Sequence, residues 1–490
     1  MDVPIILKEN IVSQINNHNS NISLDMIDDN KYIILKENYH LHNWPDKTLL
    51  IFNGIEVMSL NLDASKIVEK LNGEYTLSEI VSNMSNKKKN LYLREYFLIK
   101  TFILQLYKRD LIDFLENKEY RKIRITGSRK WFVPYSCSIE ITKRCDLRCK
   151  HCYGEAGGIN NIQLTEEEIY SILDNLHDGC KNISLTGGDP MCHPKIKEII
   201  KYCMLLGFET TLITNGMRID NEWASWLSKA GIKRVKLSLD GSTSYMHDEL
   251  RGIKGAFDKL MSSMKYLKNE NVNFSIGTVI TKENLEFIDE ISNIAYKNGA
   301  KSIGFGRIVN QGRAKKEIQD IEGYNIKEII EKIDKTMRAY RENDFLVTYE
   351  EDGNWINTFQ DKCPSLEEYY LYKDRNIKCS CSGCGAGSRL LFIEANGNVK
   401  PCMMSCFSFG NIKGCNDIKN IINEKSNKCF SNLENPDLDT CKSCKYLSDC
   451  LGCISKSMAK GSTVECNWKD KILKDNLDMR RIFNFEVDYV

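Results

Sequence analysis

The segment TKRCDLRCKHCYG (residues 142–154) follows directly on an apolar run, SIEIT, and decides the interpretation of the whole chain. It places Cys145, Cys149 and Cys152 on one loop, with three residues between the first two cysteines and two between the last two. Three thiolates on one loop can hold three irons of a [4Fe–4S] cube and leave the fourth iron open. The alternative is a zinc site with His151 as fourth ligand, since zinc prefers four closed ligands.

Six short β-type runs alternate with helical stretches from Ser138 to about Asn310. The runs are SIEIT, NISLT, TTLIT, RVKLSL, NFSIGTVI and SIGFGRIV. After the first of them, Thr165 and Glu168 form a capping-box pattern that opens a helix. Repeated βα units predict a parallel sheet. Six units are too few for a closed eight-stranded barrel, so we expect a partial barrel with its functional residues at the carboxyl ends of the strands.

Glycine-rich and polar loops end the second, third and fourth of these runs. They read Gly187-Gly188-Asp189-Pro190, Thr214-Asn215-Gly216 and Ser238-Leu239-Asp240-Gly241. Glycine lets the backbone approach a ligand closely. In this order and at successive strand ends, the loops and the cysteine segment together resemble the radical S-adenosylmethionine (SAM) superfamily.

That resemblance implies SAM as a cofactor, which chelates the open iron and is cleaved by the reduced cluster to give a 5′-deoxyadenosyl radical. It also implies contacts to SAM from the residues of the three loops, namely Gly187, Gly188, Asp189, Asn215, Ser238 and Asp240. The family usually has Glu where this chain has Asp189, so that contact can run through backbone carbonyls. Arg251 can pair with the SAM carboxylate through a bidentate fork, or form a salt bridge on a helix surface.

The C-terminal region is rich in cysteine: 13 of the 20 cysteines lie from Cys363 to Cys466. The segments CSCSGCGAGSRLLFIEANGNVKPCMMS and CKSCKYLSDCLGC resemble the SPASM extension of radical SAM maturases, which implies two auxiliary [4Fe–4S] clusters. The first cluster takes Cys384, Cys402, Cys453 and either Cys379 or Cys381. The second takes Cys441, Cys444, Cys450 and Cys466. Two residues separate Cys450 from Cys453 where the family usually has three, and zinc knuckles are the alternative for the region.

The N-terminal 115 residues have the pattern of a small winged-helix-like α+β domain. Asn53-Gly54 between apolar runs predicts a hairpin, Asp63 can cap a short helix, and Thr76 with Glu79 forms a capping box. The order of elements resembles a PqqD-like recognition element, in which an edge strand and a helix hold the leader of a precursor peptide. A generic winged helix is the alternative. The charged residues 116–134 suit a solvated connector.

Composition restricts the class of partner. The 68 Lys and Arg residues nearly balance the 67 Asp and Glu residues, so the charge gives no preference for nucleic acid or an anionic membrane. The N-terminus has no basic region followed by a long apolar run, and no apolar stretch is long enough to span a bilayer. We therefore expect a cytoplasmic protein, in which clustered cysteines are metal ligands rather than disulfides.

The expected fold class is α/β, since 490 residues need more than one core. The expected domains are a PqqD-like leader-recognition domain (1–115), a linker (116–134), a partial (β/α)6 radical SAM core (135–312), a bridging helical region (313–362) and a SPASM domain (363–490). The domain order resembles maturases of ribosomally made peptides, and enzymes similar to sactipeptide and ranthipeptide synthases join a cysteine sulfur to a carbon.

The resemblance therefore implies a thioether-forming enzyme. Its partners would be a precursor peptide with a leader and an electron donor such as flavodoxin or ferredoxin. Carbon–carbon cross-linking, formylglycine formation in sulfatases and a non-enzymatic iron–sulfur carrier are the alternatives. Intact SAM loops argue against the carrier, which needs no open iron.

Overall fold

The structure is a computed structural model of the full chain. It describes residues 27–52, 55–84, 89–157, 161–308, 311–318, 326–340, 342–351, 354–355, 386–387, 389–405, 408–414, 417–422 and 466. The described residues form two compact units, one within residues 1–131 and the other from residue 132 onward. Within these ranges, no helix has the length and apolar content that a membrane span needs.

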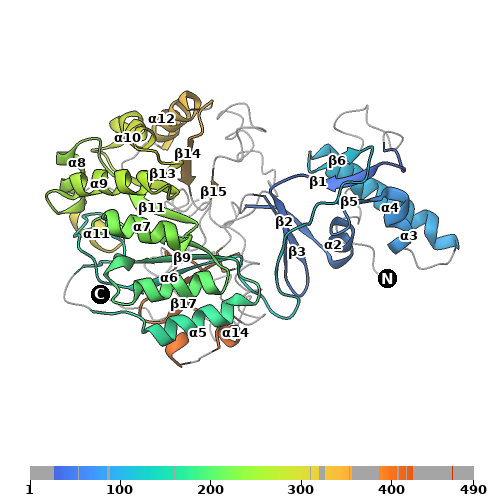
Figure 1. The fold of residues 1–490 in the computed structure, drawn as a ribbon, viewed down its shortest axis with the longest axis horizontal. Coiled ribbons are helices and arrows are strands. Elements are labelled where there is room, and N and C mark those ends of the chain that lie inside the picture. Colours follow the sequence, from blue (N-terminus) through green and yellow to red (C-terminus); the bar gives the residue numbers. More distant parts are fainter. Residues whose placement is uncertain are drawn as a thin grey trace. The chain divides into compact units, whose positions relative to one another are not determined.

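The described residues of the first unit form two small sheets and three helices (Figure 1). One sheet has the antiparallel order β5-β1-β6, formed by β1 (Tyr32–Leu35), β5 (Asn72–Thr76) and β6 (Ile112–Leu115). The other has the order β4-β3-β2-β7, formed by β2 (Tyr39–Asn43), β3 (Thr48–Phe52), β4 (Ile55–Leu60) and β7 (Ile125–Gly127). The helices are α2 (Leu62–Val68), α3 (Leu77–Met84) and α4 (Lys89–Lys108). Side chains from both sheets and all three helices share one apolar core.

Local signals in this unit were predicted with mixed success. The antiparallel β3–β4 hairpin is confirmed, although the Asn53-Gly54 turn lies outside the described residues. The capping box is confirmed, since Thr76 N donates to Glu79 Oε2 (2.9 Å) and Glu79 N donates to Thr76 Oγ1 (3.3 Å). The prediction that Asp63 caps α2 was wrong. The helix begins at Leu62, so Asp63 lies in its first turn, and the N-cap is Asn61, whose Oδ1 accepts from Ala64 N (2.8 Å).

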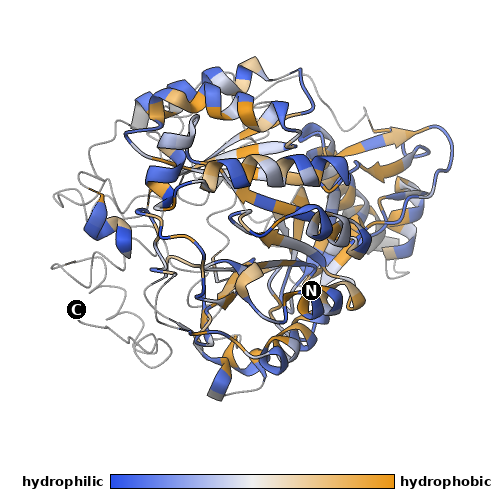
Figure 2. Ribbon diagram, turned by 60° about the vertical axis from the view of Figure 1, so that its left-hand side comes forward, coloured by the Kyte–Doolittle hydropathy of each residue, from blue (hydrophilic) through white to orange (hydrophobic). Residues whose placement is uncertain are grey.

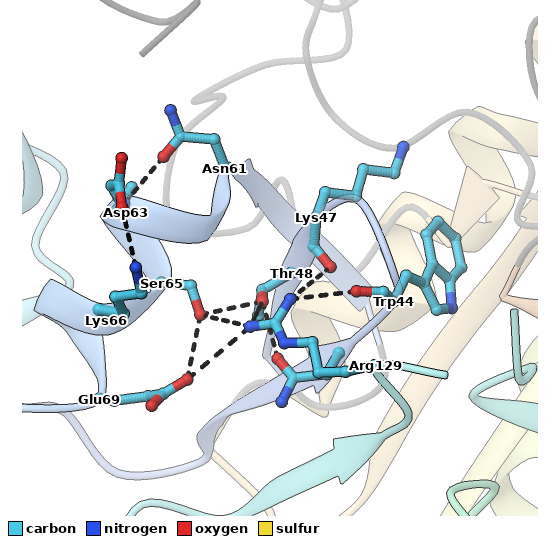
Figure 3. A network of polar contacts seen from close by, with 11 residues as sticks. Trp44, Lys47, Thr48, Asn61, Asp63, Ser65, Lys66, Glu69 and Arg129 are labelled. Atoms are coloured by element: carbon cyan, nitrogen blue, oxygen red, sulfur yellow. Dashed lines mark hydrogen bonds and ion pairs between the residues drawn. The ribbon is translucent and has the colours of Figure 1, made fainter. Parts of the chain in front are cut away.

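The charged segment 116–134 is not only a solvated connector. It contains β7, which pairs in parallel with β2, and it ends in a polar network around Arg129 (Figure 3). One guanidinium nitrogen of Arg129 donates to Thr48 Oγ1 (2.8 Å) and Ser65 Oγ (2.9 Å), and the other donates to the carbonyl of Trp44 (3.1 Å). Both hydroxyl-bearing residues are fully buried, so this arginine fixes the segment to the first unit.

We expect Arg129→Met to lower the free energy of unfolding of the first unit by about 1–3 kcal/mol, because it removes hydrogen bonds from a charged donor to buried acceptors. Urea unfolding of the full chain measures this. The matched control is Lys66→Met, which removes only the exposed ion pair with Asp63 (3.1 Å) and should cost under about 1 kcal/mol. Equal effects of the two substitutions would contradict the anchoring role of Arg129.

The second unit is built on a sheet of the order β15-β14-β13-β12-β11-β10-β9-β8-β16-β17-β18. All six predicted runs are strands: β8 (Ser136–Thr142), β9 (Asn182–Gly187), β10 (Glu209–Ile213), β11 (Arg234–Ser238), β12 (Phe274–Ile280) and β13 (Ser302–Arg307). Each is parallel to its neighbour, which confirms the expected parallel sheet.

The sheet extends beyond the predicted strands at both edges. On one edge, β14 (Leu346–Glu351) pairs in parallel with β13 and carries β15 (Asn354–Trp355). The region expected to be a helical bridge therefore also supplies a strand. On the other edge, β16 (Leu390–Ile393) pairs in parallel with β8, followed by β17 (Asn398–Lys400) and β18 (Gly410–Asn411).

Among the described residues, helices that carry both apolar and polar residues (Figure 2) lie between the parallel strands, and the last one, α14, follows β18. They are α5 (Glu166–His177), α6 (Ile196–Leu205), α7 (Asn221–Ala230), α8 (Ser244–Arg251), α9 (Ala256–Asn269), α10 (Ile288–Lys297), α11 (Arg313–Glu317), α12 (Ile326–Ala339) and α14 (Ile418–Ile421). Short 3₁₀ turns are η3 (Pro190–Cys192), η4 (Leu285–Phe287) and η6 (Ile412–Gly414). The capping box of Thr165 and Glu168 is present at the start of α5, as predicted.

Candidate functional site

The parallel register brings the predicted loops to one edge of the sheet. The cysteine segment follows β8, Gly187 ends β9, Thr214 follows β10 and Ser238 ends β11. Because neighbouring strands are parallel, their carboxyl ends lie together. These loops are spread over about 100 residues of the sequence, and the sheet brings them together at one site.

The cysteine loop presents its thiols in an apolar setting. Cys149 is buried and packs with Leu147 and Ala256, and Cys145 and Cys152 pack against the same cluster. Burial raises the pKa of Cys145 to about 12 and also raises that of Cys149. Iron binds cysteine as the thiolate, so binding of a cluster has to overcome this preference of the buried sulfurs for the protonated form.

The donors fit a cluster better than a single metal ion. Within the described residues, no three His, Cys, Asp or Glu side chains are arranged to hold one metal ion. The Nε2 atom of His151 lies 3.3 Å from Asp240 Oδ2, so this histidine does not complete a zinc site with the cysteines. A [4Fe–4S] cube bonds each thiolate to a different iron, so the three sulfurs need to line a space rather than meet at a point. Two buried polar atoms beside the loop, His151 Nδ1 and Arg251 Nε, have no hydrogen-bond partner within the described part of the chain.

The first glycine loop holds the cysteine segment by its backbone. Gly188 N donates to the carbonyl of Thr142, and Asp189 N donates to that of Arg144, both at 2.7 Å. A Cβ at Gly188 would lie 2.4 Å from the Arg144 oxygen and 2.7 Å from the Lys143 oxygen. Glycine is therefore required here for the two backbones to approach each other.

The Asp189 carboxylate joins two of the predicted loops. It accepts hydrogen bonds from Met191 N, Thr214 Oγ1 and Asn215 N, each at 2.8 Å, and is almost completely buried. Burial raises its pKa to about 6, even though the three hydrogen bonds act in the opposite direction. Because the carboxylate is engaged in this way, the predicted contact of this loop with SAM would be made by its backbone.

Two residues predicted to bind SAM lie beside cysteine sulfurs, and their contact with SAM stays a prediction. The Nδ2 atom of Asn215 is 3.6 Å from Cys145 Sγ, and Nη1 of Arg251 is 3.7 Å from Cys149 Sγ. Arg251 is not on a helix surface: it is buried at the end of α8, with Nη2 2.6 Å from Asp240 Oδ2. Burial alone would raise the pKa of Asp240, and the neighbouring Arg251 holds it below its ordinary value. Ser238, at the end of β11, is half-buried opposite Gly277.

His247 supports the same network as a neutral imidazole. Asp240 N donates to its Nδ1 atom (3.2 Å), and burial, followed by the Arg251 charge, lowers the pKa of His247 to about 4. Between pH 6.5 and about 4, the unfolded chain binds a proton at this histidine that the folded chain does not. The free energy of unfolding should therefore fall as the pH falls through this range.

We expect His247→Gln, which keeps an acceptor but does not titrate, to reduce this slope by about 1.4 kcal/mol per pH unit. Urea unfolding of wild type and variant at pH 7 and pH 5 measures the difference. His40, whose burial lowers its pKa to about 4, remains in both proteins and contributes equally to both slopes. The same pH slope in the two proteins would contradict the assignment.

Only two of the predicted auxiliary-cluster cysteines lie among the described residues. Cys402 follows the hairpin of β16 and β17, and Cys466 is described without its neighbours. The others lie outside the described residues: Cys379, Cys381, Cys384, Cys441, Cys444, Cys450 and Cys453.

A polar cavity of about 220 Å³ adjoins both cysteine segments. Tyr153, next to Cys152, and Met403, next to Cys402, both line it. Two ion pairs also border it, Glu140 with Lys143 (3.2 Å) and Glu394 with Lys400 (2.6 Å). With Glu155, which also lines it, the cavity has three carboxylates and two ammonium groups, so charges of both signs face it.

Sequence reasoning gave no role to the segment after β13, which contacts the cysteine loop through Gly312 and Arg313. A signal was available, because Gln311-Gly312-Arg313 follows a strand of the same sheet, as the recognised loops do.

Comparisons with known proteins agree with this geometry. Residues 139–294 match the model of the radical SAM superfamily, and residues 384–445 match that of the SPASM iron–sulfur cluster-binding domain. An AdoMet-dependent heme synthase of Oleidesulfovibrio alaskensis is 28% identical over 65% of this chain and 81% of its own length. The subtilosin biosynthesis protein AlbA of Bacillus subtilis is 24% identical over 77% of this chain and 82% of its own.

Similarity to solved structures extends over more of the chain. The structure of Streptococcus suis SuiB bound to S-adenosylmethionine has a TM-score of 0.57 at 17% identity, covering 89% of this chain and 98% of SuiB. The structure of SuiB bound to its precursor peptide SuiA has a TM-score of 0.54, covering 87% and 97%. At this identity the similarity concerns the fold. The chain thus contains a radical SAM domain and a SPASM domain, and the protein is an enzyme that uses SAM and [4Fe–4S] clusters as its cofactors.

Proposed function

We propose that this enzyme modifies a ribosomally made precursor peptide and forms a thioether between a cysteine sulfur and a carbon of another residue. The observation that carries the proposal is the organisation of the chain: a separate N-terminal unit, then the radical SAM core, then SPASM cysteines. A similar order over 89% of the chain in SuiB, which has been solved with a precursor peptide, supports it.

The N-terminal unit has the features that leader binding needs. Within the described residues its sheets end in β5 and β6, and in β4 and β7. Glu119 N and Arg121 N already donate to carbonyls of β5, so the other edge strands are the ones that offer backbone groups to an extended peptide. We propose that the PqqD-like region, residues 1–115, holds the leader by such strand addition. Arg129 would then fix the connecting segment while the peptide is held.

In the core, the cluster and SAM supply the 5′-deoxyadenosyl radical when they are bound. The chain itself holds the cysteine loop through Gly188, fixes neighbouring loops through Asp189, and excludes water around Cys149 by burial. Cys402 and the remaining SPASM cysteines would hold auxiliary clusters that accept an electron. A cytoplasmic location and a flavodoxin or ferredoxin donor belong to the same proposal.

The test is the exact mass, with fragmentation, of the short peptide encoded beside the gene after anaerobic co-expression. Loss of two hydrogens per modified cysteine, with those thiols no longer alkylatable, is the expected result. Hydrogen loss with every thiol still alkylatable would replace the thioether by a carbon–carbon cross-link. Conversion of a cysteine to formylglycine would indicate sulfatase maturation.

A second candidate follows from the relatives named as heme synthases, which match 65% of this chain. Incubation of the reduced, reconstituted protein with an iron porphyrin carrying propionate side chains tests it. SAM cleavage that depends on the porphyrin and not on the peptide would overturn the peptide proposal.

A further inference from the structure

We propose that Arg313 is a positioning residue for the iron–sulfur cluster: it clamps the backbone of the cysteine loop and places a buried positive charge beside the cluster. It lies beyond the part of the chain that matches the radical SAM model, which ends at residue 294. The inference rests on the radical SAM core alone and does not depend on the substrate.

Three hydrogen bonds join Arg313 to the cysteine loop. Its Nε donates to the carbonyl of Cys149 (2.9 Å), its Nη1 donates to that of Ala156 (2.8 Å), and its backbone N donates to that of Cys152 (3.0 Å). The side chain is only 5% exposed. The contacts reach from the second cysteine to four residues past the third, so a single side chain fixes the shape of this half of the loop.

Gly312 brings the arginine close enough to do this. It has φ +60° and ψ −137°, a region that residues with a Cβ rarely adopt. A Cβ would lie 2.3 Å from the carbonyl oxygen of Tyr153 and 2.6 Å from that of Cys152. The chain after β13 is therefore packed directly against the backbone of the cysteine loop.

Arg313 forms no ion pair among the described residues: Glu155 is paired with Lys316 (2.7 Å), which lowers the pKa of that carboxyl, and the charge of Arg313 only helps to lower it. The side-chain hydrogen bonds of Arg313 go to carbonyl groups, and within the described ranges no Asp or Glu lies within ion-pair distance of it. A buried charge needs compensation, which a cube held by three thiolates can supply because it is anionic. Reduction makes the cube more negative, so the guanidinium should favour the reduced state and raise the midpoint potential.

The variants Arg313→Met and Arg313→Lys separate the clamp from the charge in the full-length, reconstituted protein. Met removes both, whereas Lys keeps the charge and loses the paired donors. The matched control is Lys316→Met, on the same helix, which removes only the ion pair with exposed Glu155 (2.7 Å). The readouts are the rate of iron loss to a chelator and the midpoint potential of the SAM-sensitive signal in electron paramagnetic resonance. Because SAM chelates the open iron, adding SAM changes the resonance signal of the cube at the cysteine loop and so distinguishes it from the signals of auxiliary clusters.

We expect Arg313→Met to lose iron about tenfold faster, as the loss of buried charge-assisted hydrogen bonds implies, and to have a more negative midpoint potential. Arg313→Lys should lose iron faster but keep the wild-type potential, and Lys316→Met should match wild type in both. If Arg313→Lys lost iron at the wild-type rate, the clamp would be overturned. This test holds even if Arg313→Met does not fold. An unchanged potential in a folded Arg313→Met would overturn the role of the charge.

Discussion

Replacing Cys149 with alanine should abolish formation of 5′-deoxyadenosine from SAM, down to the level without enzyme. The loop would keep two thiolates for a cube that needs three, and Cys149 is the member buried against Leu147 and Ala256. The measurement is chromatography of 5′-deoxyadenosine after incubation of the anaerobically reconstituted protein with SAM and dithionite. The SAM-sensitive resonance signal should disappear in the same sample, while signals from auxiliary clusters remain.

The matched control is Cys180→Ala. Cys180 is buried in the same unit, but its sulfur donates to the carbonyls of Tyr135 (3.7 Å) and Asn182 (3.5 Å) and also neighbours Cys137, away from the cysteine loop. Loss of that thiol should leave SAM cleavage close to wild type. Substantial 5′-deoxyadenosine from Cys149→Ala would show that the cleavage site lies elsewhere, and would contradict the assignment of the whole loop.

The sequence was informative where a local pattern and the tertiary structure agree. The six βα strands were predicted because each is a short apolar run followed by glycine or polar residues. The cysteine loop and the glycine loops were placed correctly because parallel strands bring their carboxyl ends together. No partner far along the sequence was needed for these predictions.

The outer strands could not be predicted in the same way. β14 joins the sheet only because it pairs with β13, although α11 and α12 lie between them in the sequence, and β16 pairs with β8 from about 250 residues away. Their apolar runs are short, and pairing is decided by tertiary contacts rather than by local propensity. The same holds for β7, which lies in a charged segment that alone resembles a connector.

Side-chain roles at the site were the least predictable part. The resemblance assigned Asn215 and Arg251 to SAM, but it gave no sign that their nitrogens would also lie beside cysteine sulfurs. Arg251, at the end of α8, also forms a buried pair with Asp240 in the loop after β11, and a sequence does not show which charged residues will be buried together. Arg313 was missed because its partners are carbonyl groups, which have no sequence signature.

Gly188→Ala should lower SAM cleavage by about 100-fold, because a new methyl group would lie 2.4 Å from the Arg144 carbonyl oxygen and force the cysteine segment away. Both obstacles, the oxygens of Arg144 and Lys143, belong to the backbone, so no flexible side chain can move aside. The 2.7 Å bonds from Gly188 N and Asp189 N would lengthen with this movement. The rate of 5′-deoxyadenosine formation and the iron content per chain measure the effect.

The control substitution is Gly306→Ala on β13 of the same sheet, where an added Cβ meets no atom within 4 Å. Its iron content and unfolding midpoint should match wild type, which separates a general cost of alanine in the sheet from the specific contact at Gly188. Wild-type SAM cleavage by Gly188→Ala would show that the segment can shift without loss. The close approach of the two backbones at Gly188 would then not be required for SAM cleavage.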